Sequence, residues 1–170
     1  MAPLKHEIAQ QRPFSSREEE AMLNILRTAD CLEHDFQRAT RTWGVTVTQY
    51  NVLRILRGAH PRGLTCKAIG DRMITAVPDI TRLLARLKAQ KLIRQERDPE
   101  DRRMVWTRIS VKGLELLQAM DPIVQKAPRE MLEHLGEDGL DRLIRLLELA
   151  RGRCGRTQQE LSCDGNEEPA

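Results

Sequence analysis

The sequence has few aromatic residues and no long hydrophobic run. Phenylalanine, tryptophan and tyrosine make up 3% of its 170 residues, whereas charged residues make up 31%. We therefore expect a core built from aliphatic side chains. No apolar segment approaches the roughly 18 residues that a membrane-spanning helix needs, and no signal-peptide core lies near the N-terminus. These absences predict a cytoplasmic protein with no membrane partner.

Cysteine and histidine are also scarce, with four of each. Cys31, Cys66, Cys154 and Cys163 are irregularly spaced, which indicates cytosolic thiols rather than a disulfide framework. No CxxC or HxxxH pair is present, so we expect neither a metal site nor a cofactor. The sequence also lacks a nucleophile elbow and a P-loop, and nothing in it indicates an enzyme.

Positive charge is concentrated in one segment. Residues 62–113 contain 13 Lys and Arg against 6 Asp and Glu, a net charge of +7 in a chain whose total is +3. The remaining residues carry a net charge of −4. A basic segment between acidic flanks predicts binding to a polyanion. A solvated basic face is an alternative for any one residue, but it explains the clustering poorly.

The N-terminal part of the chain predicts a flexible arm followed by one long helix. Residues 1–15 are polar and contain Pro3 and Pro13, which favours an arm. Ser16 and Glu19 have the spacing of a helix-capping box, in which the Glu19 side chain returns to the Ser16 amide. Apolar residues then recur every three or four positions: Met22, Ile25, Ala29, Leu32, Phe36, Ala39 and Trp43.

This helix would be too long for a small domain. About 27 residues at 1.5 Å each span roughly 40 Å, whereas a 100-residue domain has a radius of gyration of about 13 Å. The helix should therefore extend beyond its own domain, and its apolar seam favours pairing with a second copy of the chain. The alternative is a long helix that wraps around its own core.

Three shorter helices are predicted between residues 46 and 90. Thr46 or Thr48 can cap the first, which ends in a Gly-Ala-His-Pro turn, and Thr65 can cap the second. Pro78 suits the first turn of the third helix. Two short helices joined by a tight turn predict a helix-turn-helix.

The third of these helices is amphipathic and basic. Asp79 suits the positive end of its dipole. Its apolar stripe consists of Ile80, Leu83, Leu84 and Leu87, and its other faces carry Thr81, Arg82, Ala85, Arg86 and Lys88.

A β-hairpin is predicted next. Residues 92–97 and 104–109 have strand character, and the tip between them carries Asp101, Arg102 and Arg103. A short helix fits the roughly 12 Å wide major groove of DNA, and arginine is attracted by the negative potential of a narrow minor groove. The pattern predicts a mainly α-helical protein with a small β-hairpin wing, a winged helix-turn-helix.

Two helical segments are predicted after the hairpin. Ser110 can cap the first, and Pro122 and Pro128 should kink or break it. An apolar spacing of three and four predicts a last helix at residues 137–152. From residue 153 the chain is polar and contains glycine and proline, so a disordered tail is expected at 153–170.

The residues of the second strand resemble a known family signature. The segment 101–113 is similar to D-x-R-x-x-x-V-x-L-T-x-x-G, the wing signature of the MarR (multiple antibiotic resistance regulator) family. Asp101, Arg103 and Gly113 match it directly. Ile109 and Ser110 are close substitutes, and Thr107 replaces the usual valine. Upstream, Ile80-Thr81-Arg82-Leu83 and Arg86-Leu87 are similar to the family's recognition helix. The resemblance covers residues 15–152.

The resemblance implies a bacterial transcription factor, usually a repressor, that acts as a homodimer on double-stranded DNA. Residues 16–45 and 111–152 would form the dimerisation helices, and residues 46–110 the DNA-binding domain. A two-fold dimer should bind a pseudo-palindromic operator. Arg103 would enter the minor groove, Asp101 would position it, and Arg102 would face phosphate. The major groove would be met by Ala76, Pro78, Asp79, Thr81, Arg82 and Arg86.

The resemblance also implies regulation, because relatives bind phenolic or acidic compounds between the dimerisation helices and the winged domain. Cys31, His34, Trp43 and Tyr50 are the candidate lining residues for such a small aromatic or acidic effector. Trp43 and Tyr50 are equally well explained as core residues. Cys31 could instead be a redox sensor, although a small buried hydrophobe is the commoner fate of a free cysteine. Metal sensing through Cys31 and His34 would need further ligands.

The DNA-contact candidates also have simpler explanations. Asp101 and Arg103 could form an exposed hairpin ion pair, which would stabilise little. Thr81 could bond back to its own helix, and Asp79 could cap that helix or accept from a cytosine amino group. The alternative for the whole domain is a winged helix that binds protein, which would not require the basic segment or the arginine tip.

Overall fold

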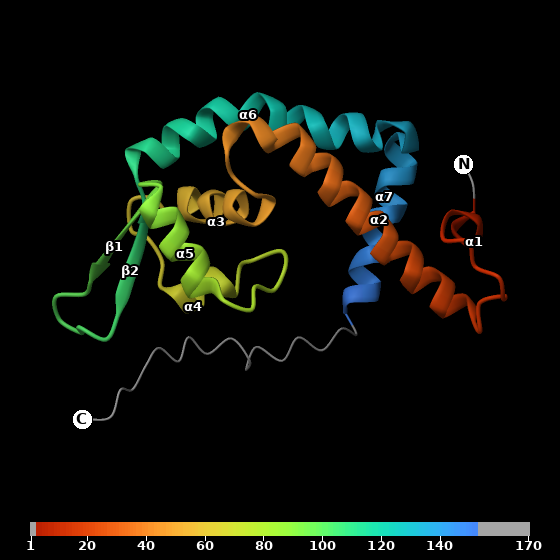
Figure 1. Cartoon of the computed structure of the whole chain (residues 1–170), viewed down its shortest axis with the longest axis horizontal. Coiled ribbons are helices and arrows are strands. Elements are labelled where there is room, and N and C mark those ends of the chain that lie inside the picture. Colours follow the sequence, from red (N-terminus) through yellow and green to blue (C-terminus); the bar gives the residue numbers. More distant parts are fainter. Residues whose placement is uncertain (1–2, 153–170) are drawn as a thin grey trace.

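The structure, a computed structural model, describes residues 3–152 and is mainly helical with one two-stranded antiparallel sheet, as predicted. In Figure 1, α6 arches along one side, α3 to α5 and the hairpin lie beneath one end of it, and α2 and α7 lie beneath the other. The elements are α1 (Leu4–Glu7), α2 (Arg17–Thr40), a 3₁₀ turn (Arg41–Trp43), α3 (Val47–Gly58), α4 (Cys66–Gly70), α5 (Ile80–Ala89), β1 (Ile93–Arg97), β2 (Val105–Ile109), α6 (Val111–Leu132), a second 3₁₀ turn (Glu133–Leu135) and α7 (Gly136–Arg151).

The core is aliphatic and is centred on α3. Residues of α3, α4, α5 and the first half of α6 meet there with almost no exposed side-chain surface. The largest of these buried apolar side chains are Leu53, Leu56, Ile69, Leu84, Leu87, Leu117, Met120 and Val52. Because Leu117 and Met120 belong to α6, the core joins the winged domain to the long helix that leaves it.

The long N-terminal helix forms as predicted, with one difference at its start. The Ser16 side chain accepts from the Glu19 amide at 3.1 Å. The Glu19 carboxylate, however, accepts from the amide and hydroxyl of Ser15 at 2.6 and 2.7 Å, and these bonds lower its pKa. The Glu19 side chain therefore bonds mainly to Ser15, one residue before the predicted Ser16 amide, which makes only a smaller contribution to the lowered pKa. At 24 residues, α2 is roughly 36 Å long.

The segment expected to be a loose arm contains structure. Leu4–Glu7 forms the helix α1, and Leu4 is buried. Glu7 lies 3.7 Å from Arg27 of α2. The ion pair links the segment to α2, and the polar composition of residues 1–15 concealed both this contact and the buried leucine.

The prolines do not break α6. The helix continues from Val111 to Leu132 through Pro122 and Pro128, so a break was the wrong expectation, and Figure 1 shows an arched helix instead. Both prolines are exposed. A proline on an exposed face of a helix can be accommodated by a bend instead of a break.

The last helix agrees with the predicted range, but half of its apolar residues are uncovered. Ile144, Leu146 and Leu149 are 54%, 65% and 68% exposed. No helix in the described range 3–152 is long and apolar enough to cross a membrane. The tail predicted at 153–170, including Cys154 and Cys163, lies outside the described residues.

Gly113, a residue of the wing signature, lies where α6 leaves the hairpin. A Cβ atom built on it would be 2.4 Å from the Leu92 carbonyl oxygen and 2.7 Å from a side-chain carbon of Ile109. Ser110 caps the same turn, accepting from the Gly113 amide at 3.0 Å and donating to the Lys91 carbonyl at 2.7 Å. Only glycine allows α6 to start this close to the base of the wing.

We expect Gly113→Ala to lower the free energy of unfolding by about 1–3 kcal/mol, because the added methyl group must displace backbone. Gly58→Ala is the matched control, since its Cβ would meet no atom within 4 Å. In the helix α3 that change should be neutral or stabilising by up to about 1 kcal/mol. Urea unfolding followed by circular dichroism measures both variants, and equal stabilities would contradict the close contact.

Candidate nucleic-acid interface

The turn between α4 and α5 is held in place from α3. Thr65 caps α4 by accepting from the Ala68 amide at 3.3 Å. After α4, the Ile74 amide donates to the Asn51 side-chain oxygen at 3.1 Å, and Met73 is buried beside it. These contacts position the start of α5.

The helix α5 presents the predicted polar face. Asp79 is its N-cap and accepts from the Arg82 amide at 2.7 Å, so the capping role suggested for this residue is the one the structure shows. Pro78 precedes the cap instead of lying in the first turn. The predicted apolar stripe is buried, and Thr81, Arg82 and Arg86 are exposed.

The wing is fixed to the domain by a third short segment. The strand pair β1 and β2 runs in register from Ile93 opposite Ile109 to Arg97 opposite Val105. On the other side of β2, Thr107 and Leu64 exchange two backbone hydrogen bonds of 2.8 and 2.9 Å. Because β2 is paired on both sides, the base of the hairpin cannot swing freely.

Two carboxylates organise the wing tip. Asp98 accepts from the amides of Glu100 and Asp101 at 2.9 and 3.0 Å and from the Trp106 indole at 2.7 Å. Bonds from the Asp101 amide, the Trp106 indole and the Glu100 amide, in that order of effect, lower the pKa of Asp98, which keeps it ionised. Asp101 accepts from the backbone amide of Arg103 at 3.0 Å. The sequence did not identify Asp98, since its role depends on the fold of the tip.

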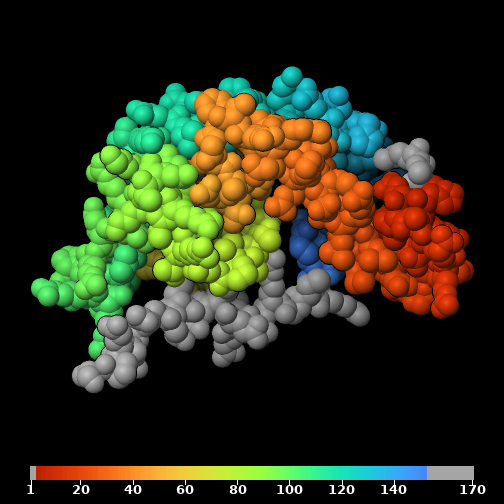
Figure 2. Space-filling model, in the orientation of Figure 1, coloured from red at the N-terminus to blue at the C-terminus, as the bar shows by residue number. Residues whose placement is uncertain are grey.

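The nine predicted DNA-contact residues are all exposed and belong to two neighbouring elements. None of the ion pairs within residues 3–152 includes Arg82, Arg86, Arg102 or Arg103. Figure 2 shows the wing projecting at one end of the molecule, away from α1 and α2. The set comprises Ala76, Pro78, Asp79, Thr81, Arg82 and Arg86 in and before α5, and Asp101, Arg102 and Arg103 at the tip.

The predicted effector residues have different surroundings from one another. Cys31 and His34 are exposed on α2, so the expectation that Cys31 is a buried hydrophobe was wrong for this chain. Tyr50 is a core residue whose ring lies 5.7 Å from that of Phe36, and burial raises its pKa. Trp43 packs against the same core. No group of three potential metal ligands occurs among residues 3–152.

A cleft of about 200 Å³ lies beside these residues, between α2, α3 and the turn that precedes α5. One of its lining residues is Asn51, which is 5% exposed and whose side-chain nitrogen has no hydrogen-bond partner. The sequence prediction missed this cleft, and an asparagine among the apolar residues of α3 is the signal that could have indicated it. The described lining residues are Ala29, Glu33, Val47, Thr48, Asn51, Met73, Ile74 and Thr75, and none of the four effector candidates is among them.

Comparison with known proteins agrees with this geometry. The model of the MarR family matches residues 43–104. A MarR transcription factor from Planctomyces limnophilus is 38% identical, with 81% of this chain and 99% of that chain covered and a TM-score of 0.62.

Two more distant structures share the fold. The Streptomyces coelicolor regulator Sco3205, in complex with DNA, is 21% identical, with 84% of this chain and 92% of that chain covered and a TM-score of 0.71. The organohalide-sensing regulator RdhR, bound to 2,4-dichlorophenol, is 15% identical, with 93% of this chain and 98% of that chain covered and a TM-score of 0.78. The level of identity to the Planctomyces protein over nearly its whole length shows that the chain belongs to the MarR family of DNA-binding transcriptional regulators.

Proposed function

We propose that the chain is a dimeric repressor that binds a pseudo-palindromic operator, with α5 in the major groove and the wing tip in the minor groove. The observation that carries the proposal is the exposure of Arg82, Arg86, Arg102 and Arg103 without ion-pair partners in the described chain. Sco3205, of the same fold, was crystallised with DNA. Such a regulator works in the bacterial cytoplasm, where the chromosome lies.

The charge distribution favours DNA over a protein partner. The net +7 of residues 62–113 includes the exposed face of α5 and the wing. A helix of ten residues is roughly 15 Å long and fits a major groove about 12 Å wide. A protein partner would require neither the match to the groove nor the excess positive charge.

Arg103→Ala should weaken operator binding, since the side chain would lie in the negative potential of the minor groove. If it acts on phosphate, the slope of log K against log salt should fall by about 1.8, roughly 0.9 for each subunit. Arg12→Ala is the control, because Arg12 is exposed in the segment between α1 and α2. Fluorescence anisotropy over a salt series measures both, and an unchanged affinity for Arg103→Ala would remove the wing from the mechanism.

We infer that α2, α6 and α7 form the dimer interface and that residues 46–110 form the DNA-binding domain. Apolar side chains are exposed on both terminal helices. They are Met22, Ile25 and Leu26 on α2, and Ile144, Leu146 and Leu149 on α7. Exposed apolar residues grouped on two helices mark an interaction surface, and a second copy of the chain would bury them.

The double variant Leu146→Glu, Leu149→Glu should be monomeric, because burying two carboxylates in an apolar interface is costly. Ile74→Glu is a control of matched exposure, since Ile74 is 66% exposed like Leu146 but lies in the turn before α5, outside α2, α6 and α7. Sedimentation velocity distinguishes the two results. A double variant that remains dimeric would show that α7 is outside the interface.

We propose further that a small aromatic effector binds the cleft around Asn51 and releases the operator. RdhR, of the same fold, binds 2,4-dichlorophenol. In this chain the apolar lining can cover the ring, and a ligand that displaces the atoms covering the Asn51 side-chain nitrogen would give that nitrogen its missing hydrogen-bond acceptor. The carboxylate of Glu33, an exposed lining residue, disfavours acids, so a neutral phenol suits the cleft better than a carboxylate. An occupant would contact the turn 73–75 directly before α5.

2,4-Dichlorophenol should weaken operator binding by the wild-type protein, and Ala29→Phe should abolish that response by filling the cleft. Ala21→Phe, also exposed on α2 but outside the cleft lining, should retain it. The assay is operator binding at increasing phenol concentration, with sizing of each variant to confirm its oligomeric state. A response that survives Ala29→Phe would place the effector elsewhere.

A further inference from the structure

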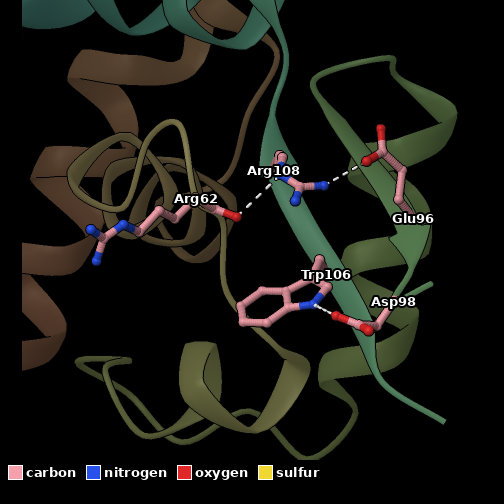
Figure 3. Close-up of polar contacts among 5 residues, drawn as sticks. All are labelled: Arg62, Glu96, Asp98, Trp106 and Arg108. Carbon is pink, nitrogen blue, oxygen red and sulfur yellow. Dashed lines mark hydrogen bonds and ion pairs between the residues drawn. The ribbon is translucent and has the colours of Figure 1, made fainter. Parts of the chain in front are cut away.

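The tip of the wing is held by backbone hydrogen bonds and by the Asp98 carboxylate, which accepts from more groups than any other side chain there. The backbone closes the turn with two hydrogen bonds of 2.9 Å, from the Asp98 amide to the Met104 carbonyl and from the Met104 amide to the Asp101 carbonyl. Asp98 then accepts two amides of the turn through one oxygen and the Trp106 indole through the other, at 2.7 to 3.0 Å. Figure 3 shows this indole bond spanning from β2 to the start of the turn. Asp98 thus links the turn to the strand that follows it.

The strand that carries Trp106 is fixed to the body of the domain by the residues that follow it. Trp106 lies opposite Glu96 in the hairpin register, and its neighbour Thr107 is buried and bonded to Leu64. On the other side, the Arg108 guanidinium donates to the Arg62 carbonyl at 3.1 Å and to the Glu96 carboxylate at 2.5 Å (Figure 3). A continuous series of contacts therefore runs from the domain through Trp106 and Asp98 to the turn.

The series ends at the arginines. Asp98 accepts from the Asp101 amide, and Asp101 accepts from the Arg103 amide at 3.0 Å. A tip ordered before binding loses less conformational entropy when it meets DNA, which raises affinity. Without this ordering effect, the Asp98 carboxylate at the tip would weaken DNA binding, because its negative charge repels phosphate.

We propose that Asp98 and Trp106 form a latch that positions Arg102 and Arg103 for DNA contact. This rests on the proposed function, in which the tip arginines contact the operator. Asp98 is a positioning residue, since it acts through the backbone of the turn. The latch leads to an expectation opposite to that of simple electrostatics. Removing the negative charge of Asp98 from the DNA-facing tip should weaken binding, although less repulsion of phosphate alone would strengthen it.

The variant Asp98→Asn tests this expectation. An asparagine has one acceptor oxygen and an NH₂ group, so it cannot accept from both the turn amides and the indole. We expect operator affinity to fall about tenfold, the effect of one net hydrogen bond to a charged group. Trp106→Phe removes the same bond from the other side and should have a similar effect, and the double variant should be no weaker than either single one. Circular dichroism confirms that the variants fold.

Glu100→Gln is the matched control. Glu100 is the neighbouring carboxylate of the turn, and it is exposed and contributes only its backbone amide to the latch. Neutralising it should leave affinity unchanged or raise it. If Asp98→Asn also left affinity unchanged or raised it, the carboxylate would act by charge alone and the latch would be overturned.

A second set of variants distinguishes a failure of the latch from a failure of the proposed function on which the latch rests. In the Arg102→Ala, Arg103→Ala background nothing remains to be positioned, so Asp98→Asn should change affinity less than twofold. An equal loss in both backgrounds would refute the positioning role. Unchanged binding by the arginine variant itself would refute the proposed wing contact. Loss with the arginine variant but not with Asp98→Asn would refute the latch alone.

Discussion

The close approach of α6 to the base of the wing is the constraint on which the rest of the molecule depends. At Gly113 the helix backbone touches the Leu92 carbonyl, and Ser110 ties the same turn to Lys91. One helical turn later, Leu117 and Met120 enter the core of the winged domain. One guanidinium nitrogen of Arg57 donates to both carboxylate oxygens of Asp121, at 2.8 and 3.0 Å, and adds a polar contact between α3 and α6. The base of the wing and the first half of the long helix therefore share one set of contacts.

In the dimer proposed above, these shared contacts would set the spacing of the two DNA-binding surfaces. In the proposed dimer, any change in the angle between α2 and α6 would be transmitted to the wing and α5 of each subunit. The cleft around Asn51 lies between α2 and the turn before α5, where a bound molecule would contact both parts. A ligand that binds one spacing of the DNA-binding surfaces more tightly than another would shift the population toward that spacing. Such a shift is sufficient for regulation by an effector.

Local chemistry made much of the fold predictable. Thr65 and Ser110 were identified as caps from residue type and position, and Thr46 was one of two candidates; each accepts the expected amide. The hairpin and the apolar stripe of α5 also followed from short-range pattern. The predictions were wrong where contacts between residues distant in the sequence determine the local structure. Leu4 anchors a helix in a polar segment, and exposed faces let α6 continue through two prolines. The exposure of Cys31 depends on which face of α2 packs against the other helices.

By itself the sequence determined the winged helix-turn-helix class, the basic segment 62–113 and the nine exposed DNA-contact candidates, because caps, periodicity and charge act over a few residues. Only the tertiary structure showed that Asp98, rather than Asp101 alone, organises the arginine tip, since that role requires Trp106 to be brought back against the turn by strand pairing. It alone showed the cleft at Asn51 as well. There, α2, α3 and the turn before α5 line a cleft with Asn51, whose side-chain nitrogen has no hydrogen-bond partner.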